Sequence, residues 1–277
     1  MTEADRYAVF GNPIKHSRSP QIHAAFAAQT GQHVSYRAQQ VELGQFASAA
    51  GEFFSSGGKG LNITVPFKLD AYQFANELSG RARRAGAVNT LALQSDGSIY
   101  GDNTDGVGMV RDIHDNLGWE ITARRVLLIG AGGGIRGVLE PLLRRHPSLV
   151  VIVNRTVEKA QQLAREFSDL GDVRACSFDA LAGNQFDLVI NGTSASLAGQ
   201  LPPLPEQLLA DNCSCYDMMY GAMPTPFMRW AAEQTAWAVA DGLGMLVEQA
   251  AESFCIWRGV RPETHAVIDA IRSSLQS

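Results

Sequence analysis

A lysine and an aspartate in the first 106 residues stand out because together they could move a proton. Lys68 follows a predicted strand over residues 61–65, and Asp105 ends the polar segment 102–105. A lysine beside a carboxylate can give a proton to, or take one from, a carbonyl/alcohol couple during hydride transfer. A solvated helix lysine and an aspartate in an ordinary turn are the alternative interpretation of the same two residues.

The polar side chains expected around this pair are mostly neutral hydroxyls and amides. They follow predicted strands, and the carboxyl ends of strands form the ligand crevice of open α/β sheets. The set comprises Ser17, Ser19, Asn62, Thr64, Lys68, Asn89, Asn103, Thr104 and Asp105. Such a set suits a small polyhydroxylated ligand that needs many directional hydrogen bonds.

A second stretch that could do chemistry is rich in glycine and runs over residues 130–134. Apolar segments before it (125–129) and after it (138–143) predict a strand, a glycine turn and a helix. In that context the backbone N–H groups and the helix N-terminus can bind a pyrophosphate. The match to G-x-G-x-x-G is incomplete because Ile135 stands at the third glycine position, and an ordinary tight turn would leave the same pattern.

The strand predicted over residues 150–153 indicates which dinucleotide would bind. It ends at Asn154, Arg155 and Thr156, and Lys159 follows. A carboxylate at this place would accept from the ribose 2′-OH of NAD, whereas a guanidinium suits the 2′-phosphate of NADP. These residues therefore favour NADP, with a solvated basic loop as the alternative.

The elements that position these groups alternate between strand and helix, which predicts an α/β fold with parallel-dominated sheets. We expect two domains flanking one cleft: an N-terminal α/β substrate domain over residues 1–106 and a Rossmann-type NADP-binding domain over residues 107–242. The last helices have no sheet of their own, so residues 243–277 are expected to return to the first domain. One helix is predicted from Pro20 with Ser19 as its cap, and another over residues 107–117.

The composition excludes several other classes of protein. The chain has 277 residues, a net charge of −5 and 45% hydrophobic residues, which is typical of a globular protein with a sizeable core. The acidic charge predicts no general attraction to nucleic acid or an anionic membrane. No signal region or membrane-length apolar run is apparent, so we expect a cytoplasmic protein, and no residue spacing predicts a metal site.

Seven blocks of sequence resemble the shikimate dehydrogenase family. They lie at residues 9–14 with 16–20, 62–68, 86–90, 101–106, 130–133, 154–156 and 241–246. The blocks span nearly the whole chain in the order of the family, which makes the set far more specific than any single motif.

The resemblance implies a role for each matching residue. The substrate would be held by Ser17, Ser19, Asn62, Thr64, Lys68, Asn89, Asp105, Tyr220 and Gln249, with the serines on its carboxylate and Lys68 with Asp105 as the proton-transfer pair. The cofactor would be held by Gly130, Ala131, Gly132, Gly133, Gly134, Asn154, Arg155, Thr156, Lys159, Met218 and Gly242.

Three departures from the family pattern concern the cofactor. Ile135 would place an apolar group where a hydroxyl could assist the phosphates, and Lys159 replaces a common arginine, so the planar fork is lost. A glycine common in the family is also absent from residues 195–197. We therefore expect altered cofactor affinity and an unchanged reaction.

The resemblance implies NADPH-dependent, reversible reduction of 3-dehydroshikimate to shikimate in aromatic amino acid biosynthesis. Two alternatives stay open: a quinate/shikimate dehydrogenase with relaxed cofactor use, and a non-catalytic NADP-binding sensor. The expected partner is the small-molecule substrate, and a homodimer is a candidate assembly.

Overall fold

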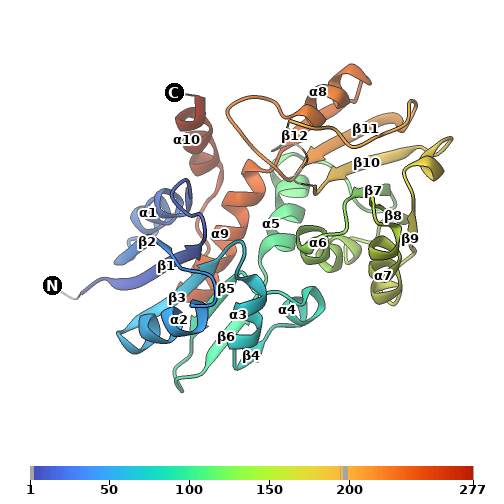
Figure 1. Ribbon diagram of the computed structural model, residues 1–277. Helices are drawn as coiled ribbons and strands as arrows, with labels where there is room; N and C mark the ends of the chain where they lie inside the picture. The colour runs from blue at the N-terminus through green and yellow to red at the C-terminus, as the bar shows by residue number, and fades with distance from the viewer. Residues whose placement is uncertain (1–2, 194, 196–198, 277) are drawn as a thin grey trace. The chain divides into compact units, whose positions relative to one another are not determined.

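The computed structural model describes residues 3–193, 195 and 199–276, and Figure 1 traces the chain through them. The departure noted over residues 195–197 therefore lies mostly outside the described residues. Contacts divide the chain into two compact units. Unit 1 comprises Met1–Gly108 and Val247–Ile271, and unit 2 comprises Met109–Leu246 and Arg272–Ser277.

Unit 1 contains a mixed six-stranded sheet in the order β2-β1-β3-β5-β6-β4. Its strands are β1 (Asp5–Gly11), β2 (Val34–Gln40), β3 (Gly58–Ile63), β4 (Glu77–Leu78), β5 (Thr90–Leu93) and β6 (Ile99–Asp102). β1 is parallel to β2 and β3, whereas β5 runs antiparallel to both β3 and β6. Because of this reversal, the end of β3, the start of β5 and the end of β6 lie side by side at the same end of their strands.

Four helices connect the strands of unit 1. They are α1 (Ser19–Thr30), α2 (Phe46–Ser55), α3 (Lys68–Phe74) and α4 (Gly80–Ala85). The expected capping role of Ser19 was wrong, since Ser19 is the first helical residue and Arg18 occupies the cap position without a side-chain bond. The Ser19 N–H instead donates to Ser17 Oγ at 3.3 Å, so the preceding loop supplies the missing acceptor.

Unit 2 contains a fully parallel six-stranded sheet in the order β12-β11-β10-β7-β8-β9. Its strands are β7 (Arg125–Ile129), β8 (Leu149–Val153), β9 (Val173–Cys176), β10 (Phe186–Asn191), β11 (Leu209–Asp217) and β12 (Ala238–Asp241). Its connecting helices include α6 (Gly133–Leu143), α7 (Val157–Phe167) and α8 (Pro226–Glu233). Read from β9, the strand order is 3-2-1-4-5-6, which is the order of the Rossmann fold. The Rossmann-type prediction is thus confirmed.

The helix predicted over residues 107–117 is two different segments. α5 (Asp105–Arg111) begins two residues earlier and changes into a π-helix at Asp112–Asn116. Within that segment the carboxylate of Asp112 accepts from Tyr216 Oη at 2.6 Å, and both side chains are buried. A tertiary contact of this kind is not visible in the local sequence pattern.

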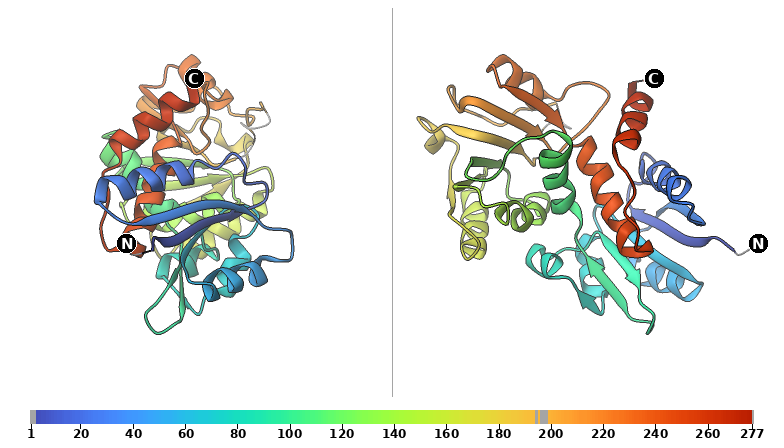
Figure 2. Two further views of the ribbon diagram at one scale, coloured as in Figure 1. Left: turned by 90° about the vertical axis from the view of Figure 1, so that its left-hand side faces the viewer. Right: turned by 180° about the vertical axis from the view of Figure 1, so that it is seen from behind.

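The C-terminal helices α9 (Leu243–Arg258) and α10 (His265–Gln276) contribute most of their length to unit 1. α9 lies against the sheet of that unit (Figure 2), where Trp257 packs on Tyr7 with ring centroids 4.7 Å apart. Trp257 Nε1 donates to the carbonyl of Leu91 at 2.9 Å, and a Cβ added at Gly60 would lie 2.4 Å from the same nitrogen. Gly60 therefore lets the helix approach the strand closely. Among the described residues, no helix is long and apolar enough to cross a membrane.

Candidate active site

The lysine and the aspartate singled out from the sequence form an ion pair in unit 1. Lys68 Nζ lies 2.5 Å from Asp105 Oδ2, and the two side chains are 30% and 13% exposed. Lys68 begins α3 after β3, and Asp105 begins α5 after β6. The pair is shielded enough to strengthen the interaction and open enough for a ligand to reach Lys68.

The position of the ion pair follows from the strand register. Asn62 on β3 pairs with Thr90 on β5, which pairs with Asp102 on β6. This row lies where β3 and β6 end and β5 begins. The segments that follow β3 and β6 therefore bring Lys68 and Asp105 close together.

Asn89 fixes the carboxylate of Asp105 from the other side. Its Nδ2 donates to Asp105 Oδ1 at 2.7 Å, while its Oδ1 accepts from the backbone N–H of Thr104 at 2.9 Å. Asn89 is only 2% exposed. Both oxygens of Asp105 are therefore bound, one to the amide and one to Lys68, and the carboxylate has a defined orientation.

The other substrate residues of unit 1 lie on neighbouring segments. Gln249 reaches the cluster from α9, where its Oε1 accepts from Thr104 Oγ1 at 3.5 Å. The backbone N–H of Thr64 donates to the carbonyl of Phe10 at 2.9 Å, which ties the loop after β3 to β1. Ser17 is half-buried and Ser19 is buried at the start of α1. Their roles toward a substrate stay a prediction.

Asn62 differs from the other predicted ligands because its side chain is fully engaged inside the protein. Its Oδ1 accepts from Tyr36 Oη at 2.7 Å and from His23 Nε2 at 3.1 Å. Its Nδ2 donates to Ser253 Oγ at 2.9 Å, and the residue is 6% exposed. Direct contact with a substrate would have to compete with these bonds.

Sequence reasoning missed four polar residues that contact the predicted ones, of which three are buried and Tyr36 is half-buried. They are His23, Tyr36, Thr90 and Ser253. Burial lowers the pKa of His23 to about 3, so its imidazole is neutral. Two signals were available: Thr90 directly follows Asn89, and Ser253 lies one helical turn after Gln249 on α9.

The glycine turn in unit 2 has the features of a phosphate cradle. Gly130 has a φ of +111°, a backbone conformation that favours glycine, and its N–H donates to the carbonyl of Val153 at 2.7 Å. Gly132 is the N-cap of α6, and it has no side chain that could bond to the first N–H groups of the helix. The space around it is open, because a Cβ added at Gly132 or Gly133 would meet nothing within 4 Å. The open N-terminus of α6 can therefore accept an anion such as a pyrophosphate.

Ile135 does not face this cradle, so the expectation that it occupies the place of a phosphate-binding hydroxyl was wrong. Its side chain is fully buried in the hydrophobic core of unit 2. A Cβ added at Gly192 would lie 2.4 Å from Ile135 Cδ1. The side chain of Ile135 therefore fits only because residue 192 is a glycine. Ile135 packs beneath the turn.

The basic residues after β8 are available to a ligand. Arg155 and Lys159 are exposed, and neither side chain has a hydrogen bond or ion pair with the described residues. Asn154 Nδ2 donates to the carbonyl of Thr156 at 2.8 Å, which shapes the loop that presents Arg155. Two cations with no partner in the described part of the chain, beside an amide and a hydroxyl, suit a phosphate group.

Three further predicted residues of unit 2 follow β11 and β12. Met218 is buried, and its N–H donates to the carbonyl of Asn191 at 2.9 Å. A Cβ at Gly242 would lie 2.3 Å from the Met218 carbonyl oxygen, so only glycine fits there. Tyr220 lies two residues after Met218 in the same unit and is half-buried.

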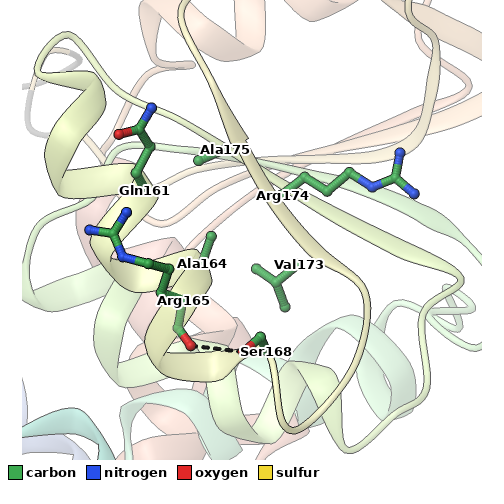
Figure 3. Close-up of a pocket in the computed structure, with 7 residues that line it drawn as sticks. All are labelled: Gln161, Ala164, Arg165, Ser168, Val173, Arg174 and Ala175. Atoms are coloured by element: carbon green, nitrogen blue, oxygen red, sulfur yellow. Dashed lines mark hydrogen bonds between the residues drawn. The ribbon is translucent and has the colours of Figure 1, made fainter.

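A pocket of about 330 Å³ lies elsewhere in unit 2, between α7 and β9 (Figure 3). It is lined by Gln161, Ala164, Arg165, Ser168, Val173, Arg174 and Ala175, none of which is a predicted site residue. The two arginines extend away from each other, and Arg174 is paired with Asp172. The pocket therefore lacks the convergent polar groups of the sites described above.

A Rossmann-type unit with an open phosphate cradle, together with a lysine–carboxylate pair on a second α/β unit, defines a dinucleotide-dependent oxidoreductase. Family models agree: residues 9–91 match the shikimate dehydrogenase substrate binding domain, 112–199 match shikimate / quinate 5-dehydrogenase, and 242–272 match the shikimate 5'-dehydrogenase C-terminal domain. The chain belongs to the shikimate dehydrogenase family.

Individual relatives are similar over nearly their whole length. A shikimate dehydrogenase (NADP(+)) from Cellvibrio japonicus is 60% identical over 271 residues, which is 98% of each chain. The crystal structure of an Ael1 enzyme from Pseudomonas putida is 49% identical, covers 96% of this chain and 98% of its own, and has a TM-score of 0.92. A shikimate 5-dehydrogenase from Thermus thermophilus, solved in complex with NADP(H) and shikimate, is 31% identical, covers 98% of this chain and 100% of its own, and has a TM-score of 0.87.

Proposed function

We propose that the chain catalyses the reversible, NADPH-dependent reduction of 3-dehydroshikimate to shikimate, a step of aromatic amino acid biosynthesis. The observation that carries this proposal is the ion pair between Lys68 and Asp105, held at 2.5 Å beside Asn89. The names of the full-length relatives support the same substrate and cofactor.

Lys68 acts as the proton donor in this proposal. Its ammonium gives a proton to the carbonyl oxygen as negative charge develops there, and Asp105 holds the ammonium in place. NADPH, when bound, supplies the hydride to the ketone carbon. In the reverse direction the neutral amine of Lys68 accepts the proton from the hydroxyl.

The remaining residues bind and orient the two ligands. Ser17 and Ser19 hold the substrate carboxylate together with Tyr220, and the ring hydroxyls contact Thr64, Asn89, Asp105 and Gln249. The α6 N-terminus after Gly130 holds the pyrophosphate, and the exposed side chains of Arg155 and Lys159, with Asn154 and Thr156, hold the 2′-phosphate. Met218 and Gly242 border the nicotinamide.

The domain roles follow from this assignment. Residues 1–106 with 243–277 form the substrate domain, and residues 107–242 form the NADP domain. We further propose a cytoplasmic homodimer. Light scattering coupled to size exclusion measures the mass in solution, and a mass of one 29.9 kDa chain at working concentration would contradict the dimer.

The deciding experiment is a turnover assay with shikimate and quinate, each with NADP and with NAD. The proposal expects shikimate with NADP to give the highest kcat/KM, because Arg155 and Lys159 suit the 2′-phosphate. Comparable rates with quinate and NAD would overturn it in favour of a dehydrogenase with relaxed specificity.

A variant of Lys68 separates the enzyme from a non-catalytic NADP-binding sensor. Lys68→Ala is expected to lower kcat by about 100-fold or more, since general acid catalysis contributes on that order. NADP affinity, measured by calorimetry, is expected to stay unchanged because the cofactor residues lie in unit 2. A wild-type protein that binds NADP without turnover would favour the sensor.

A further inference from the structure

A continuous chain of hydrogen bonds crosses the interior of unit 1 and ends at the proposed proton-transfer pair. We name it the buried chain; its members, in order, are Tyr36, Asn62, Ser253, Thr90 and Asn89, and it leads to Asp105. The links measure 2.7, 2.9, 2.8, 2.9 and 2.7 Å. Thr90 and Ser253 are fully buried, so no water competes for their hydroxyls.

The end of the chain at Asn89 has only one possible orientation. Asn89 Oδ1 accepts from the backbone N–H of Thr104, which can only donate. The amide nitrogen must therefore face Asp105, as its 2.7 Å bond to Oδ1 shows. The hydroxyl of Thr90 then donates to the oxygen of the Asn89 amide at 2.9 Å and reinforces this orientation.

The orientation of Asn62 is fixed in the same way. Its Nδ2 lies 3.3 Å from the backbone carbonyl of Asn89, which can only accept. Its Oδ1 therefore faces Tyr36 and His23, and both of them must donate. The imidazole of His23 thus carries its proton on Nε2, and burial keeps it neutral by lowering its pKa to about 3.

These two fixed ends orient the hydroxyls next to them. Asn62 donates to Ser253, and Thr90 donates to the oxygen of the Asn89 amide. The single hydroxyl proton of Ser253 has two acceptors within reach, Thr90 Oγ1 at 2.8 Å and the Gln249 carbonyl at 3.0 Å, so Ser253 links the buried chain to the backbone of α9. If Asn89 turned over, its oxygen would face the carboxylate of Asp105 and the two groups would repel each other.

We propose that Thr90, Ser253 and Tyr36 are positioning residues for the reaction: the buried chain holds the Asn89 amide so that it binds Asp105 Oδ1 and leaves Oδ2 to Lys68. This inference rests on the proposed function. In it, Asn62 acts on Asn89 through Ser253 and Thr90.

The test replaces the hydroxyl of Thr90 without changing its shape. Thr90→Val is expected to lower kcat about tenfold, because a small displacement of a catalytic group costs that much or more. KM for NADP is expected to be unchanged, since no member of the buried chain lies in unit 2. Thr90→Ser restores the hydroxyl and is expected to recover kcat to within about twofold.

A matched control shows whether any buried hydroxyl would have the same effect. Thr264 is also buried in unit 1, but its hydroxyl donates to Glu248 Oε1 at 2.6 Å, outside the buried chain. Thr264→Val is expected to keep the wild-type kcat when measured well below its melting temperature. An equal loss of kcat in this control would overturn the inference.

The remaining outcomes distinguish the inference from the proposed function. Wild-type kcat in Thr90→Val, with Lys68→Ala inactive, overturns the positioning role and leaves the function standing. Full activity of Lys68→Ala overturns the proposed function itself. If Thr90→Val does not fold, Ser253→Ala removes the adjoining link with less change in packing, and the same fall in kcat at constant KM for NADP is expected.

Discussion

At the residue scale, the proposed function assigns the choice of NADP over NAD mainly to one exposed arginine. Arg155 has no partner among the described residues, so its guanidinium is available to a 2′-phosphate. Arg155→Ala is expected to raise KM for NADP by about tenfold or more, the cost of lost hydrogen bonds to a charged group. KM for NAD is expected to stay the same. Arg165→Ala on the exposed face of α7 is the control, and an equal rise for both cofactors would contradict the assignment.

The buried position of Ile135 gives a prediction opposite to the one its sequence position suggested. Ile135→Ser, which introduces the hydroxyl, is expected to lower the free energy of unfolding by about 3 kcal/mol, because it leaves a cavity and buries a polar group. Ile135→Val is expected to cost only about 1 kcal/mol. Urea unfolding measures both values. Tighter NADP binding by a fully stable Ile135→Ser protein would show that the side chain faces the cofactor.

The sequence predicted that Lys68 and Asp105 lie together, because both follow strands that end at one sheet edge. It could not predict that Asn62 turns inward. That orientation depends on Ser253, which lies 191 positions further along the chain, and on a histidine and a tyrosine from two other elements. Side-chain contacts between distant segments leave no periodic pattern to find.

At the scale of elements, α5 and α9 approach closely at one glycine. A Cβ at Gly108 would lie 2.6 Å from the backbone nitrogen of Gln249. Gly108→Ala is expected to destabilise the protein by about 2 kcal/mol, the usual cost of overpacking, and to raise KM for shikimate because Gln249 moves. Thermal unfolding and steady-state kinetics provide the two measurements.

The control for this substitution is a glycine with free space around it. A Cβ at Gly51 in α2 would meet nothing within 4 Å, so Gly51→Ala is expected to stabilise the helix by up to about 1 kcal/mol. If Gly108→Ala were equally harmless, the helices would not be in contact through their backbones as described.

Long elements were predicted better than short ones. The strands before and after the glycine turn agree with their apolar runs, whereas β5 begins only at Thr90, although apolar residues occur from Ala87 onward. Asn89 lies directly before β5, and its side chain donates to Thr104 Oγ1 at 3.0 Å in the segment after β6. The edge strands β4 and β9 have two and four residues and little pattern of their own.

For the whole molecule, His23 makes stability depend on pH. Its pKa is about 3 in the folded protein and about 6.5 when unfolded, so the unfolded chain binds the extra proton between these values. Stability is therefore complete above about pH 6.5 and falls by about 1.4 kcal/mol per pH unit below it from this residue alone.

Urea unfolding between pH 4 and pH 7 tests this dependence. His23→Gln is expected to reduce the slope of stability against pH, whatever its effect on absolute stability. His33→Gln changes an exposed histidine and is expected to leave the slope as it is. Identical slopes for wild type and His23→Gln would show that His23 is protonated in the folded protein.

The packing of Trp257 on Tyr7 and beside His23 has an optical consequence. The chain has four tryptophans, and Trp257 is the one that lies in unit 1. In unit 2, Trp119 is buried, whereas Trp237 is 64% exposed. Each unit thus carries its own shielded fluorophore. With Trp230 and Trp237 replaced by phenylalanine, the emission of Trp257 would report the melting of the substrate unit, and that of Trp119 the melting of the nucleotide unit, in one unlabelled chain.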